Sequence, residues 1–302
     1  MDINKEPLIT FVIPTLNRKS LIRTLESLQK LKESNWLAIC VFDHIQPGEE
    51  ALNKLNSDSR FSYIVLYTKL GEGHHSAGNV RNEGIKLVRT PWVGFVDDDD
   101  WLIDTYITKM KKELECFPMA ECILFRMIDK VYLVPRAIHN DVQLQFVGIS
   151  FCCKTNVLLN GMLFKPSNCE DFELIDRLKS NNVKIIISPY IVYQCTDTDK
   201  PNDVINILEK HNTRSLLNIN HDELSSKSLF AIYGAKNKYV DVTRALWNDF
   251  LFDGLINMPN CEFNNHFGDP CINTVKTLYV YFQDVKYTVA EGANFWIKIA
   301  NL

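Results

Sequence analysis

Consecutive aspartates close an apolar run near residue 100. Residues 95–101 read Phe-Val-Asp-Asp-Asp-Asp-Trp, and so much like charge in one place is costly unless a cation occupies the site. Mg²⁺ and Mn²⁺ favour carboxylate and water ligands, and a bound nucleotide diphosphate can supply the remaining oxygens. The alternative is a solvated acidic turn or a helix N-terminus, where carboxylates gain from the helix dipole. Taken alone, the run is consistent with either interpretation.

The segments before this run are those of a parallel sheet. Apolar runs of strand length at 9–13, 37–42, 63–67 and 92–96 are separated by stretches with helical spacing of apolar residues. In open α/β sheets, ligands bind outside the carboxyl ends of the strands. Polar residues that directly follow these runs, the aspartates among them, are therefore the first candidates for a site.

The rest of the chain is mixed in pattern. Residues 122–128, 146–153 and 184–187 read as strands, and residues 171–179 and 203–220 read as helices. The polar, Ser-rich segment 222–227 reads as a linker. Beyond it, short apolar runs alternate with Gly, Asn and Pro, which predicts a small β-rich domain. We therefore expect an α/β catalytic domain over 1–224 and a β-rich accessory domain over 225–302.

Composition and charge limit the kinds of protein and partner that the chain is compatible with. The chain has 302 residues, 46% hydrophobic and 23% charged, with a net charge of -4, which is ordinary for a folded globular protein and gives no general attraction to nucleic acid. Nine cysteines without paired C-x-x-C spacing indicate reduced, mostly buried thiols. We see neither a secretory signal nor an apolar stretch of about 20 residues. We expect a cytoplasmic protein with no nucleic-acid partner and no transmembrane segment.

Several short motifs in order resemble one enzyme family. The chain offers Val-Ile-Pro-Thr-Leu-Asn-Arg at 12–18, an acid at 43 after a strand, Arg-Asn-Glu-Gly at 81–84, and the aspartate run. This order is similar to that of inverting glycosyltransferases of family 2, which have the GT-A fold, a Rossmann-like domain that binds nucleotide-diphospho-sugars. The resemblance covers about residues 8–195. It implies transfer of a sugar from a UDP-, GDP- or dTDP-linked donor to a hydroxyl group of a glycan or glycoconjugate.

The same resemblance implies site residues. Those that would bind the nucleotide-sugar are Pro14, Thr15, Asn17, Arg18, Asp43, Arg81, Asp97 and Asp98. Asp97 and Asp99 would hold Mn²⁺ or Mg²⁺. Taken singly, each has an ordinary explanation, such as a turn former, a helix cap or a solvated helix charge.

Inverting transfer also needs a general base near the acceptor hydroxyl. Family 2 enzymes usually carry it in a Glu-Asp pair that begins a helix with Arg-Leu about six residues later, and residues 170–178 fit that pattern. The resemblance makes Asp171 the candidate base. The alternative is a pair of carboxylates placed for the helix dipole.

The chain departs from the family pattern at three places. Gln194 stands where many members have His or Arg, which puts a third protein ligand to the metal in doubt. Asp43 is followed by His44 rather than by a second acid, and His74 and His75 occupy a Gly-bearing loop that is either a diphosphate contact or a surface loop.

Two other readings remain open. A sugar nucleotidyltransferase would use a related fold, but it usually has a Gly-rich loop after the first strand, where this chain has Pro14 and Thr15. The other is a degenerate, carbohydrate-binding scaffold.

For the β-rich domain we expect acceptor binding or homo-oligomerisation. We expect its aromatic residues to be mainly in the core: Trp247, Tyr279, Tyr281 and Trp296.

Overall fold

The computed structural model describes residues 6–71, 77–129, 132–136, 141–195, 213–226, 228–259 and 262–299. The first part is a parallel sheet in the order β4-β1-β2-β3. Its strands are β1 (Ile9–Thr15), β2 (Trp36–Phe42), β3 (Phe61–Val65) and β4 (Trp92–Phe95). The helices between them are α1 (Leu21–Gln29), α2 (Glu49–Asn56) and α3 (Ala77–Ile85). The parallel sheet predicted from the apolar runs is confirmed.

Helix α3 lies unusually close to the sheet because of one glycine. A Cβ atom on Gly84 would come 2.5 Å from Val12 Cγ1 and 2.9 Å from Val41 Cγ2. Contacts this short do not occur in real cores, so any larger residue would push the helix away. The glycine thus fixes the depth at which α3 presents its polar residues to the sheet edge.

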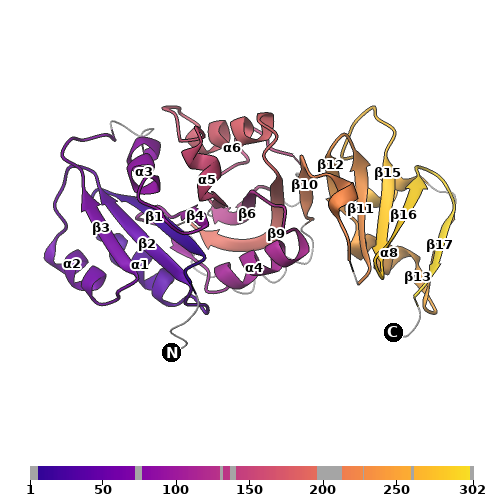
Figure 1. Ribbon diagram of the computed structural model, residues 1–302, viewed down its shortest axis with the longest axis horizontal. Coiled ribbons are helices and arrows are strands. Elements are labelled where there is room, and N and C mark those ends of the chain that lie inside the picture. Colours follow the sequence, from indigo (N-terminus) through magenta and orange to yellow (C-terminus); the bar gives the residue numbers. More distant parts are fainter. Residues whose placement is uncertain are drawn as a thin grey trace.

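The middle of the chain continues the sheet with mixed strand directions. Its elements are β5 (Trp101–Leu102), α4 (Tyr106–Cys116), β6 (Cys122–Asp129), β7 (Tyr132–Val134), β8 (Phe151–Lys154), α5 (Thr155–Leu159), α6 (Glu170–Ser180) and β9 (Ile185–Gln194). Strand β8 is antiparallel to both β4 and β6, and β6 is parallel to β9. Helices α1, α2 and α4 cover one face of the sheet, and α3, α5 and α6 cover the other (Figure 1).

The C-terminal region is rich in β structure, as expected. Its elements are β10 (Ser215–Leu217), the short 3₁₀ helix η2 (His221–Glu223), β11 (Phe230–Ala235), β12 (Lys238–Asp241), α8 (Thr243–Phe250), β13 (Leu251–Phe252), β14 (Leu255–Met258), α9 (Phe263–Phe267), β15 (Thr277–Phe282), β16 (Val285–Ala290) and β17 (Phe295–Lys298). Strands β13, β14 and β17 form a separate small sheet. Between this sheet and the larger one lies a second hydrophobic core, which includes Leu246, Ile256 and Val280.

The two regions share one sheet. Strand β10 pairs with β9 on one side and with β12 on the other, so the order runs on as β9-β10-β12-β11-β15-β16. A further apolar cluster at the junction includes Phe117 directly after α4, Ile186 of β9 and Tyr281 of β15. The predicted boundary at residue 225 falls between β10 and β11. The hydrogen bonds from β10 to β12 and the side chains of this cluster cross the boundary. The division into two domains therefore stays a prediction.

Two element predictions were wrong in part. The helix expected over 203–220 is contradicted at its end, where β10 forms; residues 203–212 lie outside the described residues. The strand expected over 146–153 begins only at Phe151. Residues 146–150 form irregular chain, in which Gly148 packs against Met127, so closely that a Cβ atom would come 2.3 Å from Met127 Sδ.

Three other expectations concern the cysteines, membrane-spanning helices and the aromatic residues of the C-terminal region. Every cysteine within the described ranges has a free thiol, but only Cys40, Cys122, Cys152 and Cys153 are buried, so the expectation of mostly buried thiols is met for half of them. No helix in the part of the chain that the structure describes has the length and apolar character to span a bilayer. Tyr281 is buried as expected, whereas Trp296 is 71% exposed, so its assignment to the core was wrong.

Candidate functional site

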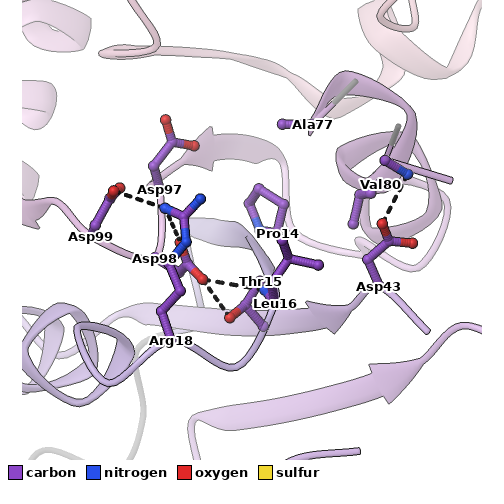
Figure 2. A pocket seen from close by; sticks show the side chains of 11 residues that line it. Pro14, Thr15, Leu16, Arg18, Asp43, Ala77, Val80, Asp97, Asp98 and Asp99 are labelled. Atoms are coloured by element: carbon purple, nitrogen blue, oxygen red, sulfur yellow. Dashed lines mark hydrogen bonds and ion pairs between the residues drawn. The ribbon is translucent and has the colours of Figure 1, made fainter. Parts of the chain in front are cut away.

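A cavity of about 320 Å³ lies at the carboxyl ends of β1, β2 and β4. Its lining residues in the described ranges are Pro14, Thr15, Leu16, Arg18, Asp43, Gly71, Ala77, Val80, Asp97, Asp98 and Asp99. Figure 2 shows Asp43 on one side of Pro14 and the three aspartates on the other. Most of the predicted nucleotide-sugar residues are therefore brought to one cavity. Asn17 and Arg81 are not among its lining residues.

Asp98 holds the turn after β1. Its Oδ2 accepts hydrogen bonds from Thr15 Oγ1 at 2.6 Å and from the Leu16 backbone N–H at 3.3 Å. Burial raises the pKa of Asp98 above its ordinary value, against these hydrogen bonds and Arg18, which favour the charged form. Asn17 takes a left-handed backbone conformation with φ 59, a conformation that Asn tolerates better than most residues. Asp98 thus holds the turn that lines the cavity, and Asn17 belongs to this turn without lining the cavity itself.

Asp43 organises the other end of the cavity. Its Oδ1 accepts from the Leu70 N–H at 2.7 Å, and its Oδ2 accepts from the Gly71 N–H at 2.8 Å. A Cβ atom on Gly71 would lie 2.7 Å from Asp43 Oδ2, so only glycine allows this close approach. Asp43 itself is buried. The carboxylate therefore pins the chain after β3 over the cavity, and its predicted contact with a nucleobase stays a prediction.

Asp97 and Asp99 are the accessible members of the aspartate run. Their side chains are 34% and 43% exposed, whereas that of Asp98 is 7% exposed. Arg18 Nη1 donates to Asp99 Oδ2 at 2.8 Å (Figure 2). Because the Arg18 side chain is 52% exposed, this ion pair is worth about 0–1 kcal/mol and is easily exchanged. Asp97 and Asp99, which the family resemblance assigns to a metal, are thus more exposed than Asp98.

Arg81 joins two acids that are far apart in sequence. One amino group of its guanidinium contacts Asp97, and the other contacts Glu170 at the start of α6. Glu170 also accepts from the Gly78 N–H at 2.8 Å. Burial lowers the pKa of Arg81, but Asp97, Asp171 and Glu170 more than compensate, so the pKa is raised and the guanidinium stays charged. This buried cation fixes α6 relative to the aspartate run.

Asp171 lies next to this cluster and lacks a partner for one oxygen. Its Oδ1 is fully buried and has no hydrogen bond within the described residues. Burial raises the pKa of Asp171 to about 7; Arg81 opposes the rise, and Asp97 and Glu170 add to it. A carboxyl group with a pKa near neutrality can accept a proton at physiological pH and release it again. Asp171 is not among the lining residues of the cavity, and its role as the general base stays a prediction.

Tyr193 is a site residue that no motif in the sequence predicted. It is fully buried on β9. Its hydroxyl accepts from the Asp97 N–H at 3.1 Å and donates to Asp100 Oδ2 at 2.9 Å. Burial raises the pKa of Asp100 to about 7, with Asp97 adding to the effect. The tyrosine therefore braces both ends of the aspartate run from a strand some 95 residues later in the chain.

The metal prediction rests on a small donor set. Within the described ranges no group of three or more His, Cys, Asp or Glu side chains is arranged to hold a metal. Asp97 and Asp99 offer two hard carboxylate donors beside the cavity, and a diphosphate and water would have to complete the coordination. Gln194, where the family often has His, is buried on β9. His74 and His75 lie outside the described residues.

The family model that matches residues 10–131 is that of glycosyl transferase family 2. Over 97 residues the chain is 29% identical to poly(ribitol-phosphate) beta-N-acetylglucosaminyltransferase TarP of Staphylococcus aureus, covering 31% of this chain and 29% of the relative. Over 105 residues it is 34% identical to the putative colanic acid biosynthesis glycosyl transferase WcaA of Escherichia coli, covering 32% and 34%. The matches thus span about a third of each relative.

Solved structures agree on the fold. The S. aureus protein TarS in complex with UDP-GlcNAc superposes with a TM-score of 0.51 at 18% identity, over 66% of this chain and 60% of that one. The mannosyltransferase PcManGT of Pyrobaculum calidifontis, in complex with GDP-Man and Mn²⁺, gives 0.50 at 12% identity, over 69% and 62%. The predicted GT-A fold is therefore confirmed.

Proposed function

We propose that the chain, whose residues 10–131 match the model of glycosyl transferase family 2, transfers a sugar from a nucleotide-diphosphate donor to a hydroxyl group of a glycan or glycoconjugate. We further propose that the reaction inverts the anomeric configuration. The donor site lies within residues 1–224, and residues 225–302 form the accessory region. The observation that carries the proposal is the cavity between Asp43 and the aspartate run.

The cavity suits a nucleoside diphosphate. Its volume of about 320 Å³ lies within the range of small-molecule sites. The Asp43 end is closed by backbone from Leu70 and Gly71 and would take the nucleoside, as the family resemblance implies. The other end carries Arg18, whose guanidinium would bind phosphate oxygens once it leaves Asp99. UDP-, GDP- and dTDP-linked sugars are all candidates.

A divalent cation, Mn²⁺ or Mg²⁺, fits the accessible pair of carboxylates. Asp97 and Asp99 would hold it, and when bound it would neutralise charge on the departing diphosphate. Arg81 supports this arrangement, because its contact fixes Asp97 in place before any ligand binds. Binding of a cation at Asp99 would also release Arg18 to the diphosphate. PcManGT, which shares the fold, is known in complex with Mn²⁺.

Asp171 is the proposed base for the transfer step. The acceptor oxygen attacks the anomeric carbon while the bond from that carbon to the diphosphate oxygen breaks. The acceptor proton passes to the Asp171 carboxylate, and the electron pair of the broken bond leaves with the nucleoside diphosphate. The raised pKa of about 7 makes this carboxylate a stronger base than an exposed aspartate. Arg81 and Glu170 keep the start of α6 in position for it.

Nucleoside diphosphate release tests the proposal. UDP-GlcNAc, UDP-glucose, GDP-mannose and dTDP-glucose are incubated with the protein and Mn²⁺, first with water as acceptor and then with a glycan mixture. We expect release from one nucleotide class, and a loss of at least about 100-fold in Asp171→Asn. Asp176→Asn, on the same helix, is the matched control and should keep full activity.

Two outcomes would contradict the proposal. Release by Asp171→Asn at the wild-type rate would remove Asp171 as the base. Binding of donors without release by the wild type, under all acceptor conditions, would favour the degenerate carbohydrate-binding scaffold instead.

A further inference from the structure

A second, larger groove lies where the β-rich region meets the rest of the sheet. Its volume is about 960 Å³. One side is formed by Pro189 of β9 and by Thr213 and Arg214 just before β10, and the other is formed by α8 and α9. The groove therefore lies where β10 joins the two regions. None of its lining residues belongs to the cavity between Asp43 and the aspartate run.

Arg214 makes one wall of the groove rigid. Its Nε donates to Glu113 Oε2 at 2.7 Å, and its Nη1 donates to Asp241 Oδ2 at 2.5 Å. Glu113 of α4 is fully buried, and the Arg214 guanidinium lies 5.2 Å from the Phe117 ring. The charge of Arg214 is thus balanced by two carboxylates. This wall is preorganised, but it does not form a site for an anion.

The opposite wall combines an aromatic ring with exposed polar groups. Trp247 of α8 is half-buried: it packs against the hydrophobic core of the β-rich region and also lines the groove. Asn248 and Asp249 follow it and are exposed. His266 of α9 lies 3.7 Å from Asp249, measured from Nδ1 to Oδ2, and its ring packs 4.9 Å from that of Phe250. An apolar face therefore lies beside an amide, a carboxylate and an imidazole.

This combination matches one class of ligand. A saccharide has apolar C–H faces that stack on an aromatic ring, and hydroxyl groups that both donate and accept hydrogen bonds. The charged side chains of the groove are of both signs, Arg214 and Arg244 against Asp241 and Asp249, which gives no general preference for an anionic or a cationic ligand. An uncharged ligand rich in hydroxyl groups suits these walls.

We propose that this groove binds a segment of a glycan chain, with Trp247 as the stacking platform and Asn248 and Asp249 as hydrogen-bonding groups. The site is separate from the donor cavity. In combination with the proposed sugar transfer, on which this last step rests, it would hold a polymeric acceptor at a distance from the point of transfer. The accessory region then contributes affinity for the acceptor rather than chemistry.

A glycan array tests the groove without the transfer reaction. The full-length wild type, Trp247→Ala and the double variant Asn248→Ala/Asp249→Ala are each applied to an array of uncharged oligosaccharides, without donor or metal. We expect the wild type to bind a set of glycans, and both variants to lose at least tenfold in signal. The double variant changes only exposed side chains, so it decides the question if Trp247→Ala fails to fold.

Two controls separate this groove from other surfaces. Trp296→Ala removes an exposed tryptophan from the small sheet of the same region, and Asp171→Asn alters the proposed transfer site; both should bind glycans like the wild type. Absence of glycan binding by the wild type would overturn the proposal, as would unchanged binding by the double variant. Loss of binding in Trp296→Ala alone would place the glycan on the small sheet instead.

Nucleoside diphosphate release should be unaffected by Trp247→Ala with water as acceptor. A failure of the donor chemistry is therefore distinguished from a failure of glycan binding.

Discussion

Replacing Asp171 with asparagine should remove a pH dependence from the stability of the metal-free protein. Burial raises the pKa of Asp171 to about 7 from an ordinary value of 3.8. Between these two values the folded protein binds a proton that the unfolded chain has released. Stability is therefore highest below about pH 4 with respect to this group, falls as the pH rises from 4 to 7, and is constant above.

The size of the effect follows from the shift. One pH unit of difference corresponds to about 1.36 kcal/mol, so a shift of about three units gives a ceiling of about 4 kcal/mol. The neighbouring charges are Arg81, which opposes the shift, and Asp97 and Glu170, which add to it. At about 2 °C per kcal/mol for a chain of this size, the Asn variant should unfold several degrees above the wild type at pH 8.

The assay is thermal unfolding from pH 4 to pH 8 in the presence of a chelator, followed by circular dichroism. The two proteins should have the same unfolding temperature near pH 4 and should diverge as the pH rises to 7. Asp176→Asn is the control and should follow the wild type at every pH. Parallel curves for the wild type and Asp171→Asn would refute the reasoning, because the carboxyl group would then titrate alike in the folded and unfolded chains.

Three further substitutions test the packing around the site. Gly84→Ala would place a Cβ atom 2.5 Å from Val12 Cγ1, so we expect a loss of about 1–3 kcal/mol in urea denaturation; an unchanged midpoint would contradict the close packing of α3. Gly71→Ala would collide with Asp43 Oδ2 and should weaken binding of the nucleoside diphosphate at least tenfold in calorimetric titration, with no change in affinity as the contrary result. Arg81→Met would leave Asp97 and Glu170 without their shared cation and should cost about 3 kcal/mol in the free energy of unfolding; a stable variant would show that the bridge is dispensable.

The sequence predicted those parts of the fold that depend on local patterns. Strands β1, β2 and β4 are buried along nearly their whole length, so they appear in the sequence as continuous apolar runs. The polar residues that follow β1, β2 and β4 meet at one edge because parallel strands end together. For this reason the cavity could be assembled from the sequence before its geometry was known.

The errors arose where pairing between distant segments decides the structure. Strand β10 has only three residues, and it is a strand because β9 and β12 hydrogen-bond to it from both sides. Its apolar residues also fit the helical spacing that starts before it. The spacing of apolar residues alone therefore predicted a helix where the chain forms a strand. Residues 146–150 are apolar enough for a strand but form irregular chain, in which Gly148 packs against Met127, a contact between segments about 20 residues apart that the local sequence does not reveal.

The connections within the site could not be predicted either. The link from Arg81 to Glu170 spans 89 positions, and that from Tyr193 to Asp100 spans 93. Nothing in the local sequence distinguishes Asp98 from its neighbours in the aspartate run, yet its side chain points inward to Thr15 while those of Asp97 and Asp99 stay accessible. The backbone of the turn after β4 determines which of these carboxylates points inward and which remain accessible.

The most direct test of donor binding in this cavity is a thermal-shift panel of UDP-, GDP- and dTDP-linked sugars, each with and without Mn²⁺. A ligand that binds only the folded protein raises its unfolding temperature by mass action. We predict a selective, Mn²⁺-dependent rise with one nucleotide class, lost in Asp99→Ala and retained in Asp171→Asn. No rise with any donor, or an equal rise in Asp99→Ala, would contradict the assignment of this cavity as a metal-dependent nucleotide-sugar site.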